Sequence, residues 1–444
     1  MSKYQAYPEY KDSGVEWLGS IPADWSVKRI QETALVISGY PFESKKFDPL
    51  VGTPLIRIRD IKAQKTEVFF NGEVPKEALV DSGDVLVGMD GDFNVAMWKS
   101  GLAALNQRVA CLRTDDKSLQ KFLFYVLPFN MKVVNDLTYF TTVKHLSNND
   151  ILKTVYALPK RAELINIVNF LDHETAKIDT LIEKQQQLIK LLKEKRQAVI
   201  SHAVTKGLNP EAPMKDSGVK WLGKVPEHWD VLNLAGVADV IDPNPSHRNP
   251  KYTEDGYPFI STVEFIGIDD VETNTPRRVA EETVIEQEQR CRFREGSIAF
   301  SRKGTIGEVR ILPKDVRFAL LDSVCVINAG SRIAYEFLYQ QCRSSLFDSQ
   351  LGAETRGAAL KQVSVGRVRG IKTFVPPMSE QKEIVSFLSV ELGKLDLLIQ
   401  KANQGIALMN ERRTALISAA VTGKIDVRNW QAPTSQQQAL EQTA

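Results

Sequence analysis

The sequence has few of the residues that build metal centres and disulfide frameworks. Its 444 residues include only four cysteines and five histidines. The cysteines lie far apart and show neither metal-ligand nor disulfide spacing; they are Cys111, Cys291, Cys325 and Cys342. We therefore expect them to be small core residues in a reducing compartment. We also expect no metal ion in this chain.

Long apolar stretches are missing as well. No run reaches the roughly 18 apolar residues that a membrane-spanning helix needs. The first residues, Met-Ser-Lys-Tyr-Gln-Ala-Tyr-Pro, contain no apolar segment of the kind found in signal peptides. The prediction is a cytoplasmic protein with no membrane partner.

The chain also lacks a surplus of positive charge, since its formal net charge is only +2. Residues 31–160 carry 16 Lys and Arg against 15 Asp and Glu, and residues 235–377 carry 19 against 19. Proteins that bind nucleic acid without discrimination usually have a basic excess. If these blocks bind DNA, positive charge must be gathered on one face, or a partner must supply it.

Motifs of catalysis are absent too. There is no Gly-x-x-x-x-Gly-Lys-Ser/Thr phosphate-binding loop. The stretch Asp242-Pro-Asn-Pro245 differs from the motif of amino-methyltransferases in its last two residues, and we interpret it as a turn. Asp60-Ile-Lys62 has the spacing of some nucleases but lacks an acidic partner upstream. We expect no catalytic residue in this chain.

What the sequence does contain is a copy of itself. The box from Lys11 to Trp25 returns, 204 positions later, between Lys215 and Trp229. Far downstream of each box, Ile167-Val-Asn-Phe-Leu recurs 217 positions later at Ile384 as Ile-Val-Ser-Phe-Leu. The order is therefore box, variable block, helix, twice over. Such a repeat indicates one scaffold that presents two different recognition surfaces.

Both long helical segments carry apolar residues at alternating steps of three and four. This spacing is typical of a coiled-coil seam. Each run covers 39 residues, or about 58 Å of helix at about 1.5 Å per residue. The seam residues predicted at the centre of the helices are Ile178, Leu181, Gln185, Leu188, Leu192, Leu395, Leu398, Ala402, Met409 and Leu416.

Charged residues in the two seams favour one orientation. Glu174 and Glu391 come early, whereas Lys195 and Arg412 come late. Parallel pairing would bring like charges together, while antiparallel pairing brings each Glu within about a turn of a cation. Because like charges in a seam are unfavourable, we expect an antiparallel two-helix coiled coil. In the alternative interpretation these side chains extend to solvent, and other residues set the orientation.

The two variable blocks, residues 31–160 and 235–377, have the pattern of mixed α/β structure with many short strands. They keep a faint register, since Gly83-Asp-Val-Leu matches Gly296-Ser-Ile-Ala. Between the strands lie loops rich in Arg, Lys, Asn and Gln, whose side chains suit base edges, and in Ser and Thr, which suit phosphates. Any single one of these residues could equally be an ordinary solvated loop residue.

The loop residues that we predict to bind DNA fall in both blocks. In the first block they are Tyr40, Lys45, Lys46, Arg57, Arg59, Asp90, Asn94, Gln107, Arg108, Thr142, Lys144 and His145. In the second block they are Asn244, His247, Arg248, Thr262, Glu264, Arg302, Lys303, Thr305, Arg356 and Lys361.

The repeated Asp-Ser-Gly-Val-x-Trp-Leu-Gly-x-Ile/Val-Pro-x-x-Trp box resembles the specificity subunits of bacterial type I restriction–modification enzymes. The helix start Pro-Pro-Met-Ser-Glu-Gln-Lys-Glu-Ile at 376–384 and the ending Val-Thr-Gly-Lys-Ile-Asp at 421–426 are similar to theirs as well. The resemblance spans nearly the whole chain. The first helix opens instead with Pro159-Lys-Arg-Ala-Glu and lacks the Ser-Glu-Gln-Lys stretch.

The resemblance implies a DNA-binding, non-catalytic subunit that recognises a split site in double-stranded DNA. It also implies that the helices set the gap between half-sites and dock two modification subunits, which use S-adenosylmethionine to methylate adenine. Restriction subunits, which use ATP and Mg²⁺, would join through them. No cofactor is expected in this chain itself.

The predicted fold class is α+β: two mixed α/β target-recognition domains separated by an antiparallel two-helix coiled coil, with an internal pseudo-twofold repeat. The expected segments are a box and first target-recognition domain at 1–160, a helix at 161–207, a second box and domain at 208–377, a helix at 378–424, and a disordered tail at 425–444.

Two other functions fit the same pattern. The chain could be the recognition module of a fused restriction–methylation enzyme, or an interaction scaffold that does not bind DNA.

Overall fold

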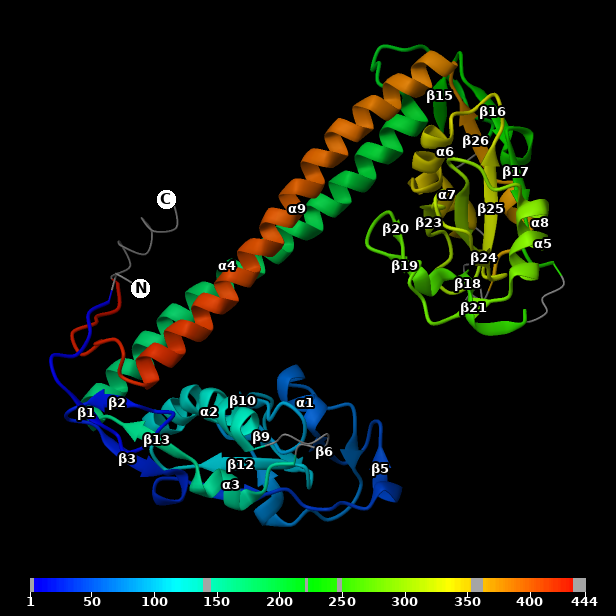
Figure 1. Ribbon diagram of the computed structural model, residues 1–444. Helices are drawn as coiled ribbons and strands as arrows, with labels where there is room; N and C mark the ends of the chain where they lie inside the picture. Colours follow the sequence, from blue (N-terminus) through cyan, green and yellow to red (C-terminus); the bar gives the residue numbers. More distant parts are fainter. Residues whose placement is uncertain (1–3, 139–144, 220–222, 246–249, 353–361, 434–444) are drawn as a thin grey trace. The chain divides into compact units, whose positions relative to one another are not determined.

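The computed structural model describes residues 4–138, 145–219, 223–245, 250–352 and 362–433. The chain divides into two compact units (Figure 1). Unit 1 comprises Met1–Lys184 and Gly405–Ala444, and unit 2 comprises Gln185–Gln404. Two long helices, α4 (Arg161–Lys206) and α9 (Met378–Val421), each contribute residues to both units.

In unit 1, short strands alternate with a few helices along the first block. The strands are β1 (Tyr10–Asp12), β2 (Ser20–Pro22), β3 (Ser26–Arg29), β4 (Leu35–Ser38), β5 (Phe47–Asp48), β6 (Thr53–Ile56), β7 (Phe69–Phe70), β8 (Leu79–Val80), β9 (Val85–Gly88), β10 (Val95–Met97), β11 (Ala103–Leu105), β12 (Val109–Arg113) and β13 (Val155–Leu158). The helices are α1 (Ile58–Ala63), α2 (Lys117–Thr138) and α3 (Asn148–Lys153).

Unit 2 repeats this series with different loops. Its strands are β14 (Met214–Asp216), β15 (Lys224–Pro226), β16 (Asp230–Asn233), β17 (Ala238–Ile241), β18 (Tyr252–Ile260), β19 (Phe265–Ile266), β20 (Asp270–Val271), β21 (Arg278–Val279), β22 (Ile298–Ser301), β23 (Val309–Ile311), β24 (Ala319–Leu320), β25 (Val324–Ala329) and β26 (Lys372–Val375). Its helices are α5 (Glu281–Cys291), α6 (Tyr335–Cys342), α7 (Ser345–Gly352) and α8 (Val365–Arg369).

The four-stranded sheets of the two units share one strand order. Unit 1 contains an antiparallel sheet of order β10-β9-β12-β4, and unit 2 contains the matching order β23-β22-β25-β17. In both units a parallel pair lies beside this sheet, β6 with β11 and β18 with β24. The central strands are runs of apolar residues that are buried on both faces, so they pair inside the core. The faint register of the two blocks in the sequence thus corresponds to one framework used twice.

The tryptophan that closes each box anchors it to the start of a long helix. Trp25 is buried, and its Nε1 donates to Glu163 Oε1 at 3.0 Å, at the start of α4. Trp229 is equally buried, and its Nε1 donates to Glu380 Oε2 at 3.1 Å, at the start of α9. Truncating a fully buried Trp to Ala costs about 3–5 kcal/mol, so each box stabilises its own unit.

Each box also receives the end of the other long helix. Gly207 follows α4 with φ +74°, and an added Cβ would lie 3.3 Å from the Trp229 ring. Gly423 follows α9 with φ +71°, and an added Cβ would lie 2.3 Å from Pro22 Cδ. At Gly423 only glycine combines this left-handed conformation with so close an approach, and at Gly207 the left-handed conformation itself favours glycine.

Within each unit, α4 and α9 run in opposite directions. In unit 1, Asp179 pairs with Arg413, whereas the earlier Asn166 donates to the later Arg428 carbonyl at 2.9 Å. In unit 2, Arg196 pairs with Asp396, and a Cβ on the later Gly207 would lie 3.2 Å from a side-chain oxygen of Glu380, earlier on α9.

The contact face of these helices differs from the predicted seam at three positions. Leu181, Leu188 and Leu398 are exposed, at 41%, 44% and 49%. Their places are taken by partly buried Ile182 and Ile189 and by buried Ile399. The other predicted seam residues are buried or half-buried: Ile178, Gln185, Leu192, Leu395, Ala402, Met409 and Leu416. Because apolar residues stand side by side at 181–182, 188–189 and 398–399, the pattern could not choose between them.

The segment after α9 is also more ordered than expected. Ile425 and Val427 are buried in the core of unit 1, and the Trp430 ring lies edge-on to Phe170, 5.6 Å between centroids. The prediction of a disordered tail from residue 425 is therefore wrong for residues 425–433. Apolar residues in a short segment without periodicity gave no signal of this docking. Residues 434–444 lie outside the described part of the chain.

Candidate nucleic-acid interface

Three predicted residues of the first block meet in one cluster at the end of the central sheet. The Asp90 carboxylate lies 2.7 Å from His145 Nδ1 and 3.6 Å from Arg108 Nη1. Arg108 Nη1 in turn lies 3.1 Å from His145 Nδ1. Backbone bonds fix the loops, because Met89 N–H donates to the Arg108 carbonyl and Leu146 N–H donates to the Met89 carbonyl. The cluster holds an arginine at the surface beside a carboxylate and an imidazole.

Beside this cluster lies a shallow depression of about 440 Å³. The residues that line it are Arg57, Ile58, Arg59, Lys62, Asn94, Asn106, Gln107 and Arg108. Arg59, Gln107 and Arg108 are exposed, whereas Arg57 is held by Asp60, with 3.0 Å from Nε to Oδ2. These guanidinium and amide groups come from helix α1 and from the loops beside the sheet, and such groups suit the acceptor edges of guanine and adenine.

Tyr40, Lys45 and Lys46 form a separate exposed group in the first block. Tyr40 N–H donates to the Leu105 carbonyl at 2.8 Å, which ties this loop to the one that carries Gln107 and Arg108. The Tyr40 ring packs against Phe42 with 5.1 Å between centroids. The two lysines follow in a 3₁₀ turn, Ser44–Lys46, and suit phosphate contacts.

The second block presents different chemistry at the equivalent positions. Lys303 forms an isolated backbone β-bridge with Gln362, as Asp90 does with His145 in the first block. The Arg302 N–H donates to the Ser323 carbonyl, and the Met89 N–H donates to the Arg108 carbonyl in the same way. Lys303 Nζ lies 2.6 Å from Asp322 Oδ2. The carboxylate of the first block is thus replaced by a cation. Thr305 is exposed nearby, and Thr262 and Asn244 are half-buried.

Two predicted DNA contacts in the second block are wrong, because these residues are buried in the protein. Glu264 is 5% exposed and accepts hydrogen bonds from Ser261, Thr275 and Arg277. Burial by itself raises the pKa of this carboxyl, but the bonds from Arg277 and Ser261 hold the pKa below its ordinary value. Glu264 therefore caps the turn Thr262–Glu264 from within, as Asp60 caps α1.

Arg302 is 3% exposed and donates to Asp242 Oδ2 at 3.0 Å and to the Asp322 carbonyl at 2.7 Å. The Arg302 guanidinium is therefore engaged inside the block, where it links its own loop to the loops of Asp242 and Asp322. The neighbouring Lys303 is the accessible cation. The sequence could not separate the two, because both follow the same strand.

Other predicted positions lie outside the described residues; these are Thr142, Lys144, His247, Arg248, Arg356 and Lys361. Asn106 belongs to a loop that the sequence already singled out, whereas sequence reasoning missed Lys62 of the depression and Asp322 beside Lys303. Extending the internal repeat would have found Asp322, because its loop is equivalent to the loop of Gln107 and Arg108.

Among the described residues, no group of His, Cys, Asp and Glu is arranged to hold a metal ion. In the same residues, no helix is both long and apolar enough to cross a membrane.

A family model described as the type I restriction modification DNA specificity domain matches residues 22–191 and again residues 226–406. Each match covers one block and most of its adjoining helix. The chain belongs to the family of type I restriction–modification specificity subunits. Specificity subunits recognise target DNA and are non-catalytic, so membership of the family implies both properties for this chain.

The sequences of related proteins align with this chain over nearly their whole length. The chain is 28% identical over 449 residues to the type I restriction enzyme EcoBI specificity subunit of Escherichia coli, covering 97% of this chain and 92% of that one. It is 22% identical over 422 residues to the MjaVIII specificity subunit of Methanocaldococcus jannaschii, covering 92% and 95%. A solved chain from a study of complex assembly and conformational transition in a type I R-M system shares the fold, with a TM-score of 0.63 at 16% identity, covering 90% of this chain and 98% of that one.

Proposed function

We propose that this specificity subunit recognises a bipartite site in duplex DNA, with one half-site read by each block. The observation that carries the proposal is that the two blocks share one framework but place different side chains at equivalent positions. Asp90 and Arg108 stand where the second block has Lys303 and Ser323, between strands of the same order. A protein with two equivalent surfaces would repeat the side chains as well, so the difference favours two unlike half-sites.

The two long helices are proposed to form an antiparallel coiled coil with a pseudo-twofold axis. The ion pairs support this arrangement, because Asp179 with Arg413 and Asp396 with Arg196 are related by the 217-residue repeat. Such helices would set the gap between the half-sites.

Two modification subunits are the proposed protein partners, with restriction subunits joining through them. The support is a set of six leucines that the two helices leave exposed, since exposed apolar side chains in number mark interaction surfaces. These are Leu181, Leu188, Leu191, Leu397, Leu398 and Leu408. S-adenosylmethionine, ATP and Mg²⁺ would then be bound by the partners, and the complex would act on DNA in the cytoplasm.

The deciding experiment replaces residues 31–160 with the matching block of a relative of known specificity. We expect one half of the methylated sequence to change and the other half to remain. The matched control replaces residues 235–377, which should change the other half. If either exchange altered both halves, the assignment of one half-site to each block would be wrong.

A gel shift with and without the modification subunits separates this proposal from the alternatives. Specific binding by the complex supports it. Methylation by this chain alone would favour the fused enzyme, and a complex without DNA affinity would favour the scaffold.

A further inference from the structure

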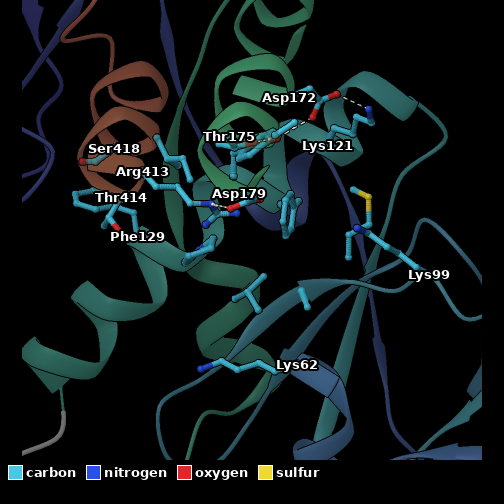
Figure 2. Close-up of a pocket in the computed structure, with 18 of the residues that line it drawn as sticks. Lys62, Lys99, Lys121, Phe129, Asp172, Thr175, Asp179, Arg413, Thr414 and Ser418 are labelled. Carbon is cyan, nitrogen blue, oxygen red and sulfur yellow. Dashed lines mark hydrogen bonds and ion pairs between the residues drawn. The ribbon is translucent and has the colours of Figure 1, made fainter. Parts of the chain in front are cut away.

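A large cleft in unit 1 adjoins the depression of the candidate nucleic-acid interface, and Lys62 lines both. It encloses about 720 Å³ between strand β10 and helices α1, α2, α4 and α9 (Figure 2). Its apolar lining comes from Val95, Met97, Phe124, Phe129 and Ile417. A volume of this size accommodates several side chains of a bound segment.

The cleft carries an excess of positive charge. Its lining includes Lys62, Lys99, Lys121, Lys132 and Arg413 but only two acidic residues, Asp172 and Asp179. Those two acids are already engaged, with Lys121 Nζ 2.5 Å from Asp172 Oδ2 and Arg413 Nε 3.0 Å from Asp179 Oδ1.

Two of these lysines are available to a ligand. Lys62 and Lys99 are exposed, and within the described part of the chain neither ammonium group has a hydrogen-bond or ion-pair partner. Both line the cleft, Lys62 from the end of α1 and Lys99 from the turn after β10. Together they offer two unneutralised cations beside an apolar surface (Figure 2).

In unit 2 the corresponding surface is covered by the chain itself. Strand β23 pairs with β22 as β10 pairs with β9, and α6 follows β25 as α2 follows β12. The hairpin β19–β20 lies on these elements. The Arg310 guanidinium on β23 donates to the Gly267 and Asp270 carbonyls at 3.0 and 3.2 Å and lies 5.2 Å from the centroid of the Phe265 ring.

At the tip of that hairpin, the Asp269 carboxylate contacts α6. Asp269 Oδ1 accepts from Tyr339 Oη at 2.5 Å and lies 2.6 Å from Arg343 Nη1. The covering segment, residues 263–272, reads Val-Glu-Phe-Ile-Gly-Ile-Asp-Asp-Val-Glu. It therefore combines apolar residues with four acidic ones.

In unit 1 the equivalent segment takes another course. After α1 the chain turns at Gln64, which has φ +53°, and Lys99 N–H donates to Gln64 Oε1 at 2.9 Å. Ser100 Oγ donates to the Gln64 carbonyl at 2.5 Å. These bonds tie the segment to the turn after β10, so it does not cover β10 and α2 as the hairpin covers β23 and α6.

We propose that the cleft of unit 1 binds an acidic polypeptide segment of a partner protein, in the manner of the β19–β20 hairpin. An aliphatic or aromatic side chain of that segment occupies the apolar lining, and its carboxylates pair with Lys62 and Lys99. The apolar lining argues against a DNA backbone, which has no group to fill it. The counterpart in unit 2 is itself protein, and it supplies the template for the ligand.

The test uses the full chain and a cyclised, fluorescent peptide of residues 263–272. We expect saturable binding by fluorescence anisotropy. The Lys62→Glu/Lys99→Glu double variant should weaken binding at least tenfold. The matched control, Lys65→Glu/Lys76→Glu, changes charge equally at exposed lysines outside the cleft and should leave binding unchanged. A peptide with Asp269→Asn and Asp270→Asn should bind at least tenfold more weakly.

Several results would overturn the proposal. One is the absence of saturable binding up to about 1 mM peptide, the limit of weak recognition. Another is equal affinity for both double variants. Displacement of the peptide by duplex DNA of arbitrary sequence would assign the cleft to nucleic acid. Self-association abolished by Lys62→Glu/Lys99→Glu would assign it to a second copy, and tighter peptide binding after removal of residues 434–444 would assign it to the chain's own tail.

Discussion

Asp179 on α4 and Arg413 on α9 form an ion pair, with 3.0 Å between Oδ1 and Nε. The geometry is that of a charge contact without an aligned hydrogen bond. The residues 217 positions away from this pair, Asp396 and Arg196, form a hydrogen-bonded pair at 3.0 Å in unit 2. Each unit thus uses one acid and one arginine to join helices that run in opposite directions.

The two ion pairs should contribute unequally to stability. The Arg196 side chain is 11% exposed, whereas that of Arg413 is 34% exposed, so water screens the second pair more. In double-mutant cycles with Asp→Asn and Arg→Met changes, we expect a coupling of about 0.2–1 kcal/mol for Asp179 with Arg413. The coupling for Asp396 with Arg196 should be larger, within about 0.5–3 kcal/mol. Thermal melting of the full chain measures both.

The control for these cycles is Glu174 with Arg412, the charges that the sequence pattern had singled out. Coupling there should be smaller than for either observed pair. A larger value would show that the seam charges, and not the observed ion pairs, hold the helices in their orientation.

Replacing Glu264 by Gln should make the stability of unit 2 less dependent on pH. The pKa of Glu264 is held below its ordinary value, so its contribution is complete above the unfolded pKa of about 4.3 and is lost as the pH falls through the folded pKa. At pH 7 we expect a loss of about 1–3 kcal/mol, since Arg277 and Ser261 lose a charged acceptor. The difference from the parent chain should shrink below about pH 4.

The Glu264→Gln variant also tests whether Glu264 only supports the fold or contributes to DNA recognition. If Glu264 only supports the fold, Glu264→Gln leaves the methylated sequence unchanged below the melting temperature. A relaxed half-site would instead return Glu264 to the DNA-contacting residues.

Lengthening both helices should widen the gap between the half-sites. Four residues inserted beside Gln185 and again beside Ala402 add about 6 Å to each helix. This length is close to two base-pair steps at about 3.4 Å each. Mapping of methylated adenines should show a gap about two base pairs longer with both halves intact. An unchanged gap in a folded, active complex would mean that the helices do not set it.

A circular permutant should fold, because the two ends of unit 1 are already joined by contacts. Asp426 N–H donates to the Gln5 carbonyl at 2.8 Å, and Tyr10 Oη donates to the Gly423 carbonyl at 3.0 Å. We expect a chain linked from Pro433 to the N-terminus, which keeps the docked Val427 and Trp430, and opened between Leu208 and Pro213, to remain soluble and specific for its DNA. Circular dichroism and methylation mapping check this. Loss of folding on opening, with the linked but uncut chain intact, would contradict equivalence of the two halves.

The repeat in the sequence identified the framework because the repeated residues are buried anchors, each with a single structural role. Trp25 and Trp229 are buried against Glu163 and Glu380, and a copied box of this kind must be copied in space to satisfy the same buried groups. The residues of the surface loops follow no such rule. Arg302 and Lys303 are neighbours, yet one is enclosed by Asp242 and the other is accessible.

By itself, the sequence determined the double framework, the two long helices and the family, since these depend on periodicity and on repeated anchor residues. Tertiary structure alone decided which of Leu181 and Ile182 faces the other helix, since both are apolar and only the packed partner selects one. It also decided that Glu264 stabilises a turn and that unit 1 keeps an open basic cleft. Those outcomes depend on contacts between residues far apart in the chain, and no local pattern records them.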